Sequence, residues 1–101
     1  MSWAINYIKY LQRGEEVSFR PRGNSMRGKV NSGDLVTIEP LWGRALKKGD
    51  IVLCRVRGHS YLHLIKAIRG RKQFLIGNNR GGTNGWITKN SIFGICTDVR
   101  K

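Results

Sequence analysis

The hydrophobic periodicity of the chain changes at Gly14, and this change limits the fold more than any other sequence feature. Before Gly14, apolar residues recur at the spacing of one helical face, at Trp3, Ala4, Tyr7, Ile8 and Leu11. After Gly14, apolar and polar residues alternate in short segments separated by glycine-containing turns, which is the pattern of β-strands. We therefore expect an amphipathic helix over residues 1–14, with Ser2 as its N-cap, and a β-domain over residues 15–101.

The β-domain contains enough short alternating segments for one antiparallel sheet. Strands are expected over residues 17–19, 35–38, 50–57, 61–68, 73–76, 86–87 and 92–99. Gly58-His59-Ser60 is predicted to turn the chain between two of these strands, and Asn84-Gly85 is predicted to form another hairpin turn. The chain has 101 residues, 13 of them glycine, and neither an internal repeat nor a linker. The fold class is therefore mostly β: a single compact antiparallel domain over residues 1–101 with one N-terminal amphipathic helix.

The charge of the chain is strongly unbalanced. Nineteen Lys and Arg residues against six Asp and Glu residues give a formal net charge of +13. A field of this sign attracts polyanions, and binding through it would be independent of sequence and sensitive to salt. If the charge serves nucleic acid or another polyanion, we expect one contiguous patch. Its expected members are Arg20, Arg22, Arg55, Arg57, Arg69, Arg71 and Lys72.

The two cysteines, Cys54 and Cys96, lie far apart in the sequence, each inside an apolar run. Without a Cys-x-x-Cys pair or clustered histidines, they indicate small buried residues of a reduced, cytoplasmic protein. We expect no metal site and no cofactor. No apolar run approaches the ~18 residues of a membrane-spanning helix, so we expect no membrane insertion.

Four ordered segments carry the functional signal of the sequence. They are Gly23-Asn24-Ser25-Met26, Ser32-Gly33-Asp34-Leu35-Val36, Lys48-Gly49-Asp50-Ile51-Val52 and Tyr61-Leu62-His63-Leu64-Ile65. In order and spacing they resemble the serine peptidases of the LexA-like and type I signal peptidase superfamily. Members of that superfamily have a nucleophilic serine before a methionine, two Gly-Asp pairs at strand starts, and a general base on a later strand. The resemblance covers about residues 19–98 and implies the β-rich catalytic core of that superfamily.

The resemblance implies roles for individual residues. Ser25 matches the nucleophile, and His63 matches the base of the variants that use histidine instead of lysine. Met26 and Asp34 belong to the matched segments and are expected to support the site. Gly77-Asn78-Asn79 resembles the Gly-Asp-Asn segment of the histidine variants. Asn78 or Asn79 is therefore expected to lie behind His63 and to orient it without supplying charge.

These residue types fit acyl transfer. A serine hydroxyl becomes a nucleophile when a neighbouring base takes its proton, and histidine can do this at neutral pH. Lys66 is an alternative base, but strand alternation directs it to the face opposite His63. The sequence thus indicates a small serine peptidase-like protein that hydrolyses a peptide bond in a peptide or protein substrate. The alternative is an inactive module of the same fold that binds nucleic acid or a nucleoprotein partner through its basic surface.

Overall fold

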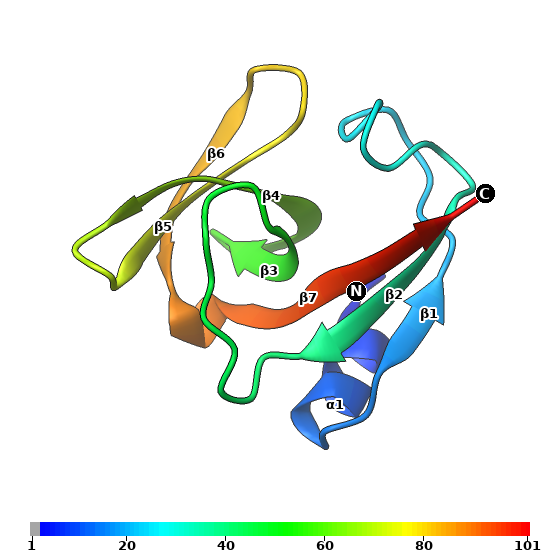
Figure 1. Cartoon of the computed structure of the whole chain (residues 1–101), viewed down its shortest axis with the longest axis horizontal. Coiled ribbons are helices and arrows are strands. Elements are labelled where there is room, and N and C mark those ends of the chain that lie inside the picture. The colour runs from blue at the N-terminus through cyan, green and yellow to red at the C-terminus, as the bar shows by residue number, and fades with distance from the viewer. Residues whose placement is uncertain (1–2) are drawn as a thin grey trace.

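The computed structural model describes residues 3–101, and this part of the chain forms one α-helix and seven strands (Figure 1). The elements are α1 (Ile5–Gln12), β1 (Val17–Phe19), β2 (Leu35–Pro40), β3 (Ile51–Val56), β4 (His59–Arg69), β5 (Gln73–Gly77), β6 (Thr83–Thr88), the short 3₁₀ helix η1 (Lys89–Ser91) and β7 (Ile92–Arg100). The predicted fold class, mostly β with one N-terminal helix, is confirmed.

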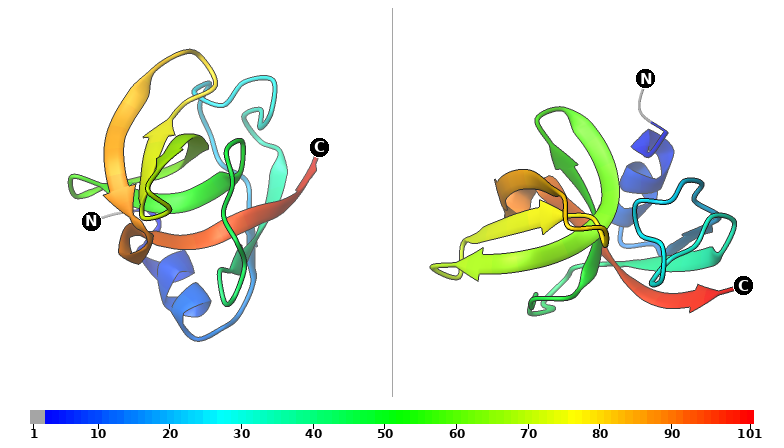
Figure 2. Two further views of the ribbon diagram at one scale, coloured as in Figure 1. Left: turned by 60° about the vertical axis from the view of Figure 1, so that its left-hand side comes forward. Right: turned by 90° about the horizontal axis from the view of Figure 1, so that it is seen from above.

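All seven strands belong to one antiparallel sheet with the order β1-β2-β7-β3-β4-β5-β6. The last strand, β7, lies inside the sheet, where it pairs with β2 on one side and with β3 on the other. Register shifts interrupt four of the six strand pairs, and such bulges bend and twist a sheet. The resulting sheet is strongly curved (Figures 1 and 2). This curvature brings the β1–β2 loop, residues 20–34, next to β4 and the β5–β6 loop.

Apolar clusters cover both faces of the sheet, and β3 shows this most directly. Leu53 joins the cluster that includes the buried residues of α1, whereas Val52 and Cys54 join a second cluster with Phe74. Successive residues of β3 are therefore buried on opposite faces. This is the physical reason that residues 51–54 form an uninterrupted apolar run, the pattern of a strand that is buried on both sides.

α1 packs against β1, β2 and β7, and it buries the apolar face that the helical spacing predicts. Ala4, Ile8 and Leu11 are all buried. Trp3 differs in part from the expectation: it precedes the first helical turn and is 51% exposed beside a pocket, although its ring contacts the rings of Tyr7 and Phe19. Ser2, the predicted N-cap, lies outside the described residues. In the described part of the chain, no helix has the length and apolar character needed to cross a bilayer.

Leu11→Ala is expected to lower the free energy of unfolding by about 2–5 kcal/mol. Leu11 is 1% exposed, and its Cδ1 lies 3.1 Å from the position that a Cβ on Gly94 of β7 would take, so helix and sheet are closely packed there. Urea denaturation measures the change. Lys9→Ala, on the exposed side of α1, is the matched control and should shift the unfolding free energy by no more than about 0.5 kcal/mol. Equal small effects of both substitutions would contradict this account of the helix.

Short loops close the hairpins at both ends of β4: two residues, 57–58, join β3 to β4, and three residues, 70–72, join β4 to β5. Arg57-Gly58 and Gly70-Arg71 have positive φ at both positions, the mirror-image geometry that matches the twist of the flanking strands. The predicted turn at Gly58-His59-Ser60 is therefore wrong in its bounds. His59 is the first residue of β4 and pairs with Val56.

The predicted Asn84-Gly85 turn is also wrong, because the chain reverses earlier. Asn78 Oδ1 accepts hydrogen bonds from the amides of Arg80 and Gly82, each at 2.9 Å, and the Asn78 amide donates to Gly82 O. This side chain closes a compact turn of the kind that asparagine favours. Asn84 and Gly85 consequently lie inside β6, which pairs with β5.

Candidate active site

Ser25 lies on the β1–β2 loop, in a segment fixed to the core by the next residue. Met26 is 4% exposed and belongs to the cluster beneath α1, whereas Ser25 is exposed. Two local hydrogen bonds fold the segment: the Arg27 amide donates to Asn24 O, and the Val30 amide donates to Met26 O. A buried methionine beside an exposed serine therefore presents the hydroxyl at the surface on an ordered turn.

Polar side chains hold the loop from both ends. Asp34 Oδ2 accepts from the Asn31 amide at 2.9 Å, and Asn31 Oδ1 accepts from the Gly28 amide at 3.0 Å. From the β5–β6 loop, the Asn79 amide donates to Ser25 O at 2.9 Å, and Asn79 Nδ2 donates to Arg27 O at 2.8 Å. Asp34 and Asn79 thus position the backbone around Ser25.

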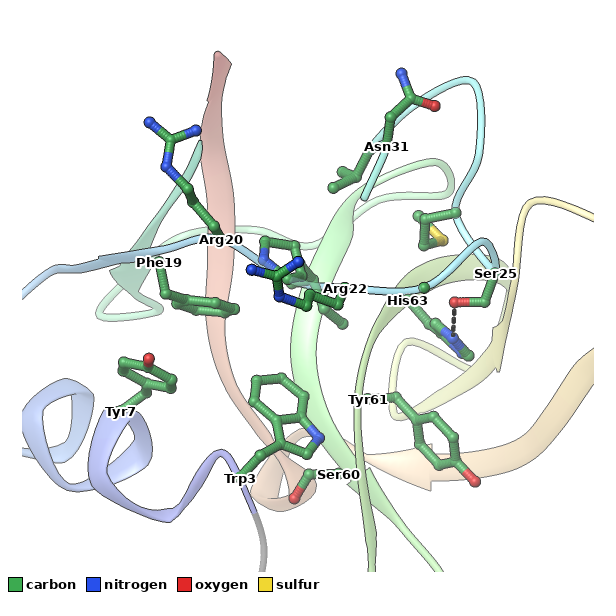
Figure 3. Close-up of a pocket in the computed structure, with 15 residues that line it drawn as sticks. Trp3, Tyr7, Phe19, Arg20, Arg22, Ser25, Asn31, Ser60, Tyr61 and His63 are labelled. Carbon is green, nitrogen blue, oxygen red and sulfur yellow. Dashed lines mark hydrogen bonds between the residues drawn. The ribbon is translucent and has the colours of Figure 1, made fainter. Parts of the chain in front are cut away.

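His63 comes from the middle of β4 and meets Ser25 directly. Its side chain is buried, and its Nε2 lies 3.2 Å from Ser25 Oγ (Figure 3). The ring of Tyr61 lies beside it, with 4.8 Å between the ring centroids. The other imidazole nitrogen, Nδ1, lies 2.7 Å from Oδ1 of Asn84 on β6. Three segments far apart in the sequence therefore meet in the order serine, histidine, asparagine.

The group behind His63 differs from the expectation. The sequence points to Asn78 or Asn79, but Asn78 closes its own turn and Asn79 binds the Ser25 loop, so Asn84 takes this place. The physical reason is the early turn around Asn78, which places Asn84 inside β6 and within reach of β4. No motif in the sequence marks Asn84. Asn84 could have been identified only from the pairing register of β6, which places this residue beside His63.

The Asn84 contact determines which imidazole nitrogen carries the proton. An amide oxygen only accepts hydrogen bonds, so Nδ1–H donates to Asn84 Oδ1 and Nε2 presents its lone pair to the Ser25 hydroxyl. Burial lowers the pKa of His63 below its usual 6.5, and the hydrogen bond to Asn84 partly opposes this shift. His63 is therefore neutral, and able to accept a proton, at pH values where a free histidine is still largely charged.

Substitution of Asn84 is expected to shift the pKa of His63 in a direction set by charge. Asn84→Asp should raise it, because a carboxylate at Nδ1 favours the imidazolium form. Asn84→Ala should lower it, because the hydrogen bond that raises the pKa of His63 is lost. NMR titration of the imidazole protons measures both shifts, with exposed His59 as the internal control. A His63 titration unchanged in both variants would contradict the Asn84 contact.

Other candidate groups do not reach Ser25. Lys66 Nζ donates to Asn78 O at 2.9 Å, away from the Ser25–His63 pair. Cys54 is fully buried, and burial raises the pKa of its thiol to about 12, so the thiol stays protonated at neutral pH. Within residues 3–101, no three His, Cys, Asp or Glu side chains gather in a way that could hold a metal ion. Of the candidate groups in this described part of the chain, only His63 approaches the Ser25 hydroxyl.

A pocket of about 500 Å³ opens beside the pair of Ser25 and His63 (Figure 3). The segment from Trp3 through α1, the end of β1, the β1–β2 loop and the first half of β4 contribute its walls. The lining residues are Trp3, Tyr7, Phe19, Arg20, Pro21, Arg22, Gly23, Ser25, Met26, Val30, Asn31, Ser60, Tyr61, Leu62 and His63. The hydroxyl and the imidazole therefore face a space large enough for several amino-acid side chains.

The seven residues expected to form a polyanion patch are spread over the fold. Arg20 and Arg22 line the pocket, whereas Arg57 and Arg71 occupy the turns at opposite ends of β4. Two guanidinium groups cover aromatic rings, Arg55 over Phe93 and Arg69 over Trp86. Lys72 is exposed beside the β4–β5 turn. The set is therefore divided between the two ends of β4 rather than gathered in one place.

Comparison with known proteins agrees with this architecture. A family model described as Peptidase S24-like matches residues 5–96, from α1 into β7, and the match includes both Ser25 and His63. No curated protein matches the chain. Since the family match covers most of the chain, the β-sheet with its N-terminal helix is a peptidase-type domain. The chain belongs to the Peptidase S24-like family, within the superfamily of LexA-like and signal peptidases.

Proposed function

We propose that this protein is a serine hydrolase that cleaves peptide bonds, with Ser25 as nucleophile and His63 as general base. One observation carries the proposal: Ser25 Oγ lies 3.2 Å from His63 Nε2, on an imidazole whose other nitrogen is bound to Asn84. This distance is within the range of a catalytic hydrogen bond, which is often long before substrate binds. Because Nδ1 donates to Asn84, the nitrogen that faces the Ser25 hydroxyl is the unprotonated one, which can take the hydroxyl proton.

The reaction follows from these three groups. As Ser25 Oγ attacks the carbonyl carbon of the scissile bond, its proton passes to His63 Nε2 and the carbonyl oxygen becomes an oxyanion. The imidazolium then gives this proton to the nitrogen of the leaving amine, and the C–N bond breaks. Water, deprotonated by the same imidazole, hydrolyses the resulting ester at Ser25. Asn84 holds the ring in place throughout but supplies no negative charge to the imidazolium.

The backbone around Ser25 supplies a donor for the oxyanion. Within residues 3–101, the Ser25 amide makes no backbone hydrogen bond, so this N–H is available to a bound substrate. The carbonyl of the same residue is held by the Asn79 amide, which limits the movement of this peptide unit. A preorganised donor beside the nucleophile stabilises the charge that develops in the transition state.

An extended peptide fits along the edge of β4 next to His63. Tyr61, Leu62 and His63 pair with β3 on one side, and pairing with β5 on the other side begins only at Leu64. The edge between Tyr61 and His63 borders the pocket and faces the Ser25 segment. Main-chain hydrogen bonds along this edge would bind a substrate as an added strand, with its carbonyl carbon near Ser25.

The proposal is tested by incubating the purified chain with unstructured peptides and identifying the products by mass spectrometry. We expect fragments cut at defined bonds, with a rate that rises with pH through a pKa below 6.5, because the neutral form of His63 is the base. Absence of cleavage over the range from about pH 5 to 9 would overturn the proposal.

A further inference from the structure

The pocket beside Ser25 contains an aromatic wall that the cleavage reaction itself does not need. Tyr7 and Phe19 stack with 4.3 Å between their ring centroids, and the Trp3 ring lies 5.6 Å from Phe19. Trp3 is nevertheless 51% exposed, which is a large apolar surface for a small domain to leave uncovered. Tyr7 belongs to α1, Phe19 to β1, and Trp3 to the segment before α1, and together the three rings form a surface suited to a large apolar side chain.

Two arginines add positive charge to the same pocket. Arg20 Nη1 donates to Gly33 O at 2.8 Å, which holds its guanidinium in place. Arg22 forms neither an ion pair nor a hydrogen bond with any of residues 3–101, and in Figure 3 its guanidinium stands above the ring of Trp3. In the described part of the chain, no Asp or Glu lines the pocket. The positive charge is therefore left for a ligand to neutralise, and carboxylate and phosphate are the groups whose geometry suits a guanidinium.

We propose that this pocket selects peptide substrates in which a large apolar side chain stands beside an acidic residue. The apolar side chain packs on Trp3, Tyr7 and Phe19, and the carboxylate pairs with Arg22, with Arg20 adding to the field. The inference rests on the proposed function, because it names the substrate class of the same site. Trp3, Tyr7 and Arg22 thus become specificity residues, and α1 becomes part of the substrate pocket as well as of the core.

Aromatic rings and arginines also bind nucleic acid, but the surroundings favour a peptide. Among residues 3–101, β4 has no second strand partner at Tyr61–His63, and this edge, which borders the pocket, offers main-chain groups that an extended peptide satisfies. Arg57 and Arg71 do not extend the charge of the pocket as one basic track, since they lie at opposite ends of β4. A nucleic-acid strand needs such a track along its phosphates.

The experiment uses four pools of internally quenched peptides that are otherwise built from Ala, Ser and Gly. Each pool contains either Phe or Ala next to either Glu or Gln. For the wild-type protein, we expect kcat/KM for the Phe-Glu pool to exceed that for the Phe-Gln pool by about tenfold or more, the effect of one charge-assisted hydrogen bond. Arg22→Gln should reduce this preference to about twofold or less, whereas Trp3→Ala should reduce the preference for Phe over Ala.

Arg27→Gln is the matched control, because Arg27 is exposed on the same loop but does not line the pocket. It should keep the preference for Glu. Circular dichroism of every variant verifies that the fold is retained. Cleavage of all pools at similar rates would overturn the subsite inference and leave the proposed function standing.

The same pools are titrated against the Ser25→Ala variant, so that binding is measured without turnover. If no pool is cleaved by the wild type but Phe-Glu peptides bind this variant most tightly, the proposed function fails and the subsite stands. A short single-stranded oligonucleotide is added as competitor. If it displaces the peptides more effectively than unlabelled Phe-Glu peptide does, the pocket is a nucleic-acid site and the inference is overturned.

Discussion

Ser25→Ala is expected to reduce peptide hydrolysis by about 10⁴-fold or more, because it removes the hydroxyl that forms the covalent intermediate in the proposed reaction. Ser25 is exposed, and the only side-chain hydrogen bond of its hydroxyl within residues 3–101 is to His63, so the fold should tolerate the change. Ser18→Ala is the matched control, since Ser18 is an exposed serine whose hydroxyl is hydrogen-bonded to Thr37 on the neighbouring strand. Hydrolysis of the quenched peptides measures both variants. Residual activity within about tenfold of the wild type would exclude Ser25 as the nucleophile.

His63→Gln is expected to reduce hydrolysis at neutral pH by about 10³-fold or more, which is the upper part of the range for losing a general base. Glutamine keeps a polar group beside Asn84 but has no basic nitrogen to take the Ser25 proton. The chain contains two histidines, which makes the control simple: His59→Gln, at the exposed start of β4, should leave the rate unchanged. Equal rates for the two variants would contradict the role of His63.

Lys66 provides a separate check on the same assignment. Its ammonium donates to Asn78 O in the β5–β6 loop, so Lys66→Met should loosen that loop and lower the rate by no more than about tenfold. A loss from Lys66→Met as large as that from His63→Gln would instead identify lysine as the base. The pH–rate profile separates the two cases, because only a histidine base with a lowered pKa retains activity below pH 6.5.

The fold could be predicted from the sequence wherever the local periodicity of apolar residues matches the residues that the fold buries. The helical spacing before Gly14 predicts α1 because Ala4, Ile8 and Leu11 must share one buried face, and they do. The strand around residues 51–56 is equally clear, because its residues are buried on both sides of the sheet. Trp3 follows the same helical spacing but lines the pocket instead, since spacing indicates which residues share a face and not what covers that face.

The residues of the candidate site could be predicted only where they lie in a recognisable motif. Ser25 and His63 lie in segments that resemble a known superfamily, so their meeting could be anticipated. Asn84 has no such mark, and its position depends on the register of β6, which the side chain of Asn78 sets by closing the turn early. Turn chemistry of this kind depends on which backbone amides a short side chain reaches, and alternation of residue types does not reveal it.

Reaction with a fluorophosphonate probe shows whether His63 activates the Ser25 hydroxyl. The probe phosphonylates only an activated serine, and mass spectrometry of a digest locates the modified residue without any knowledge of the substrate. We predict modification of Ser25 in the wild-type chain, a much slower reaction in His63→Gln, and none in Ser25→Ala. An unmodified wild-type chain, or modification of a different serine, would contradict this activation.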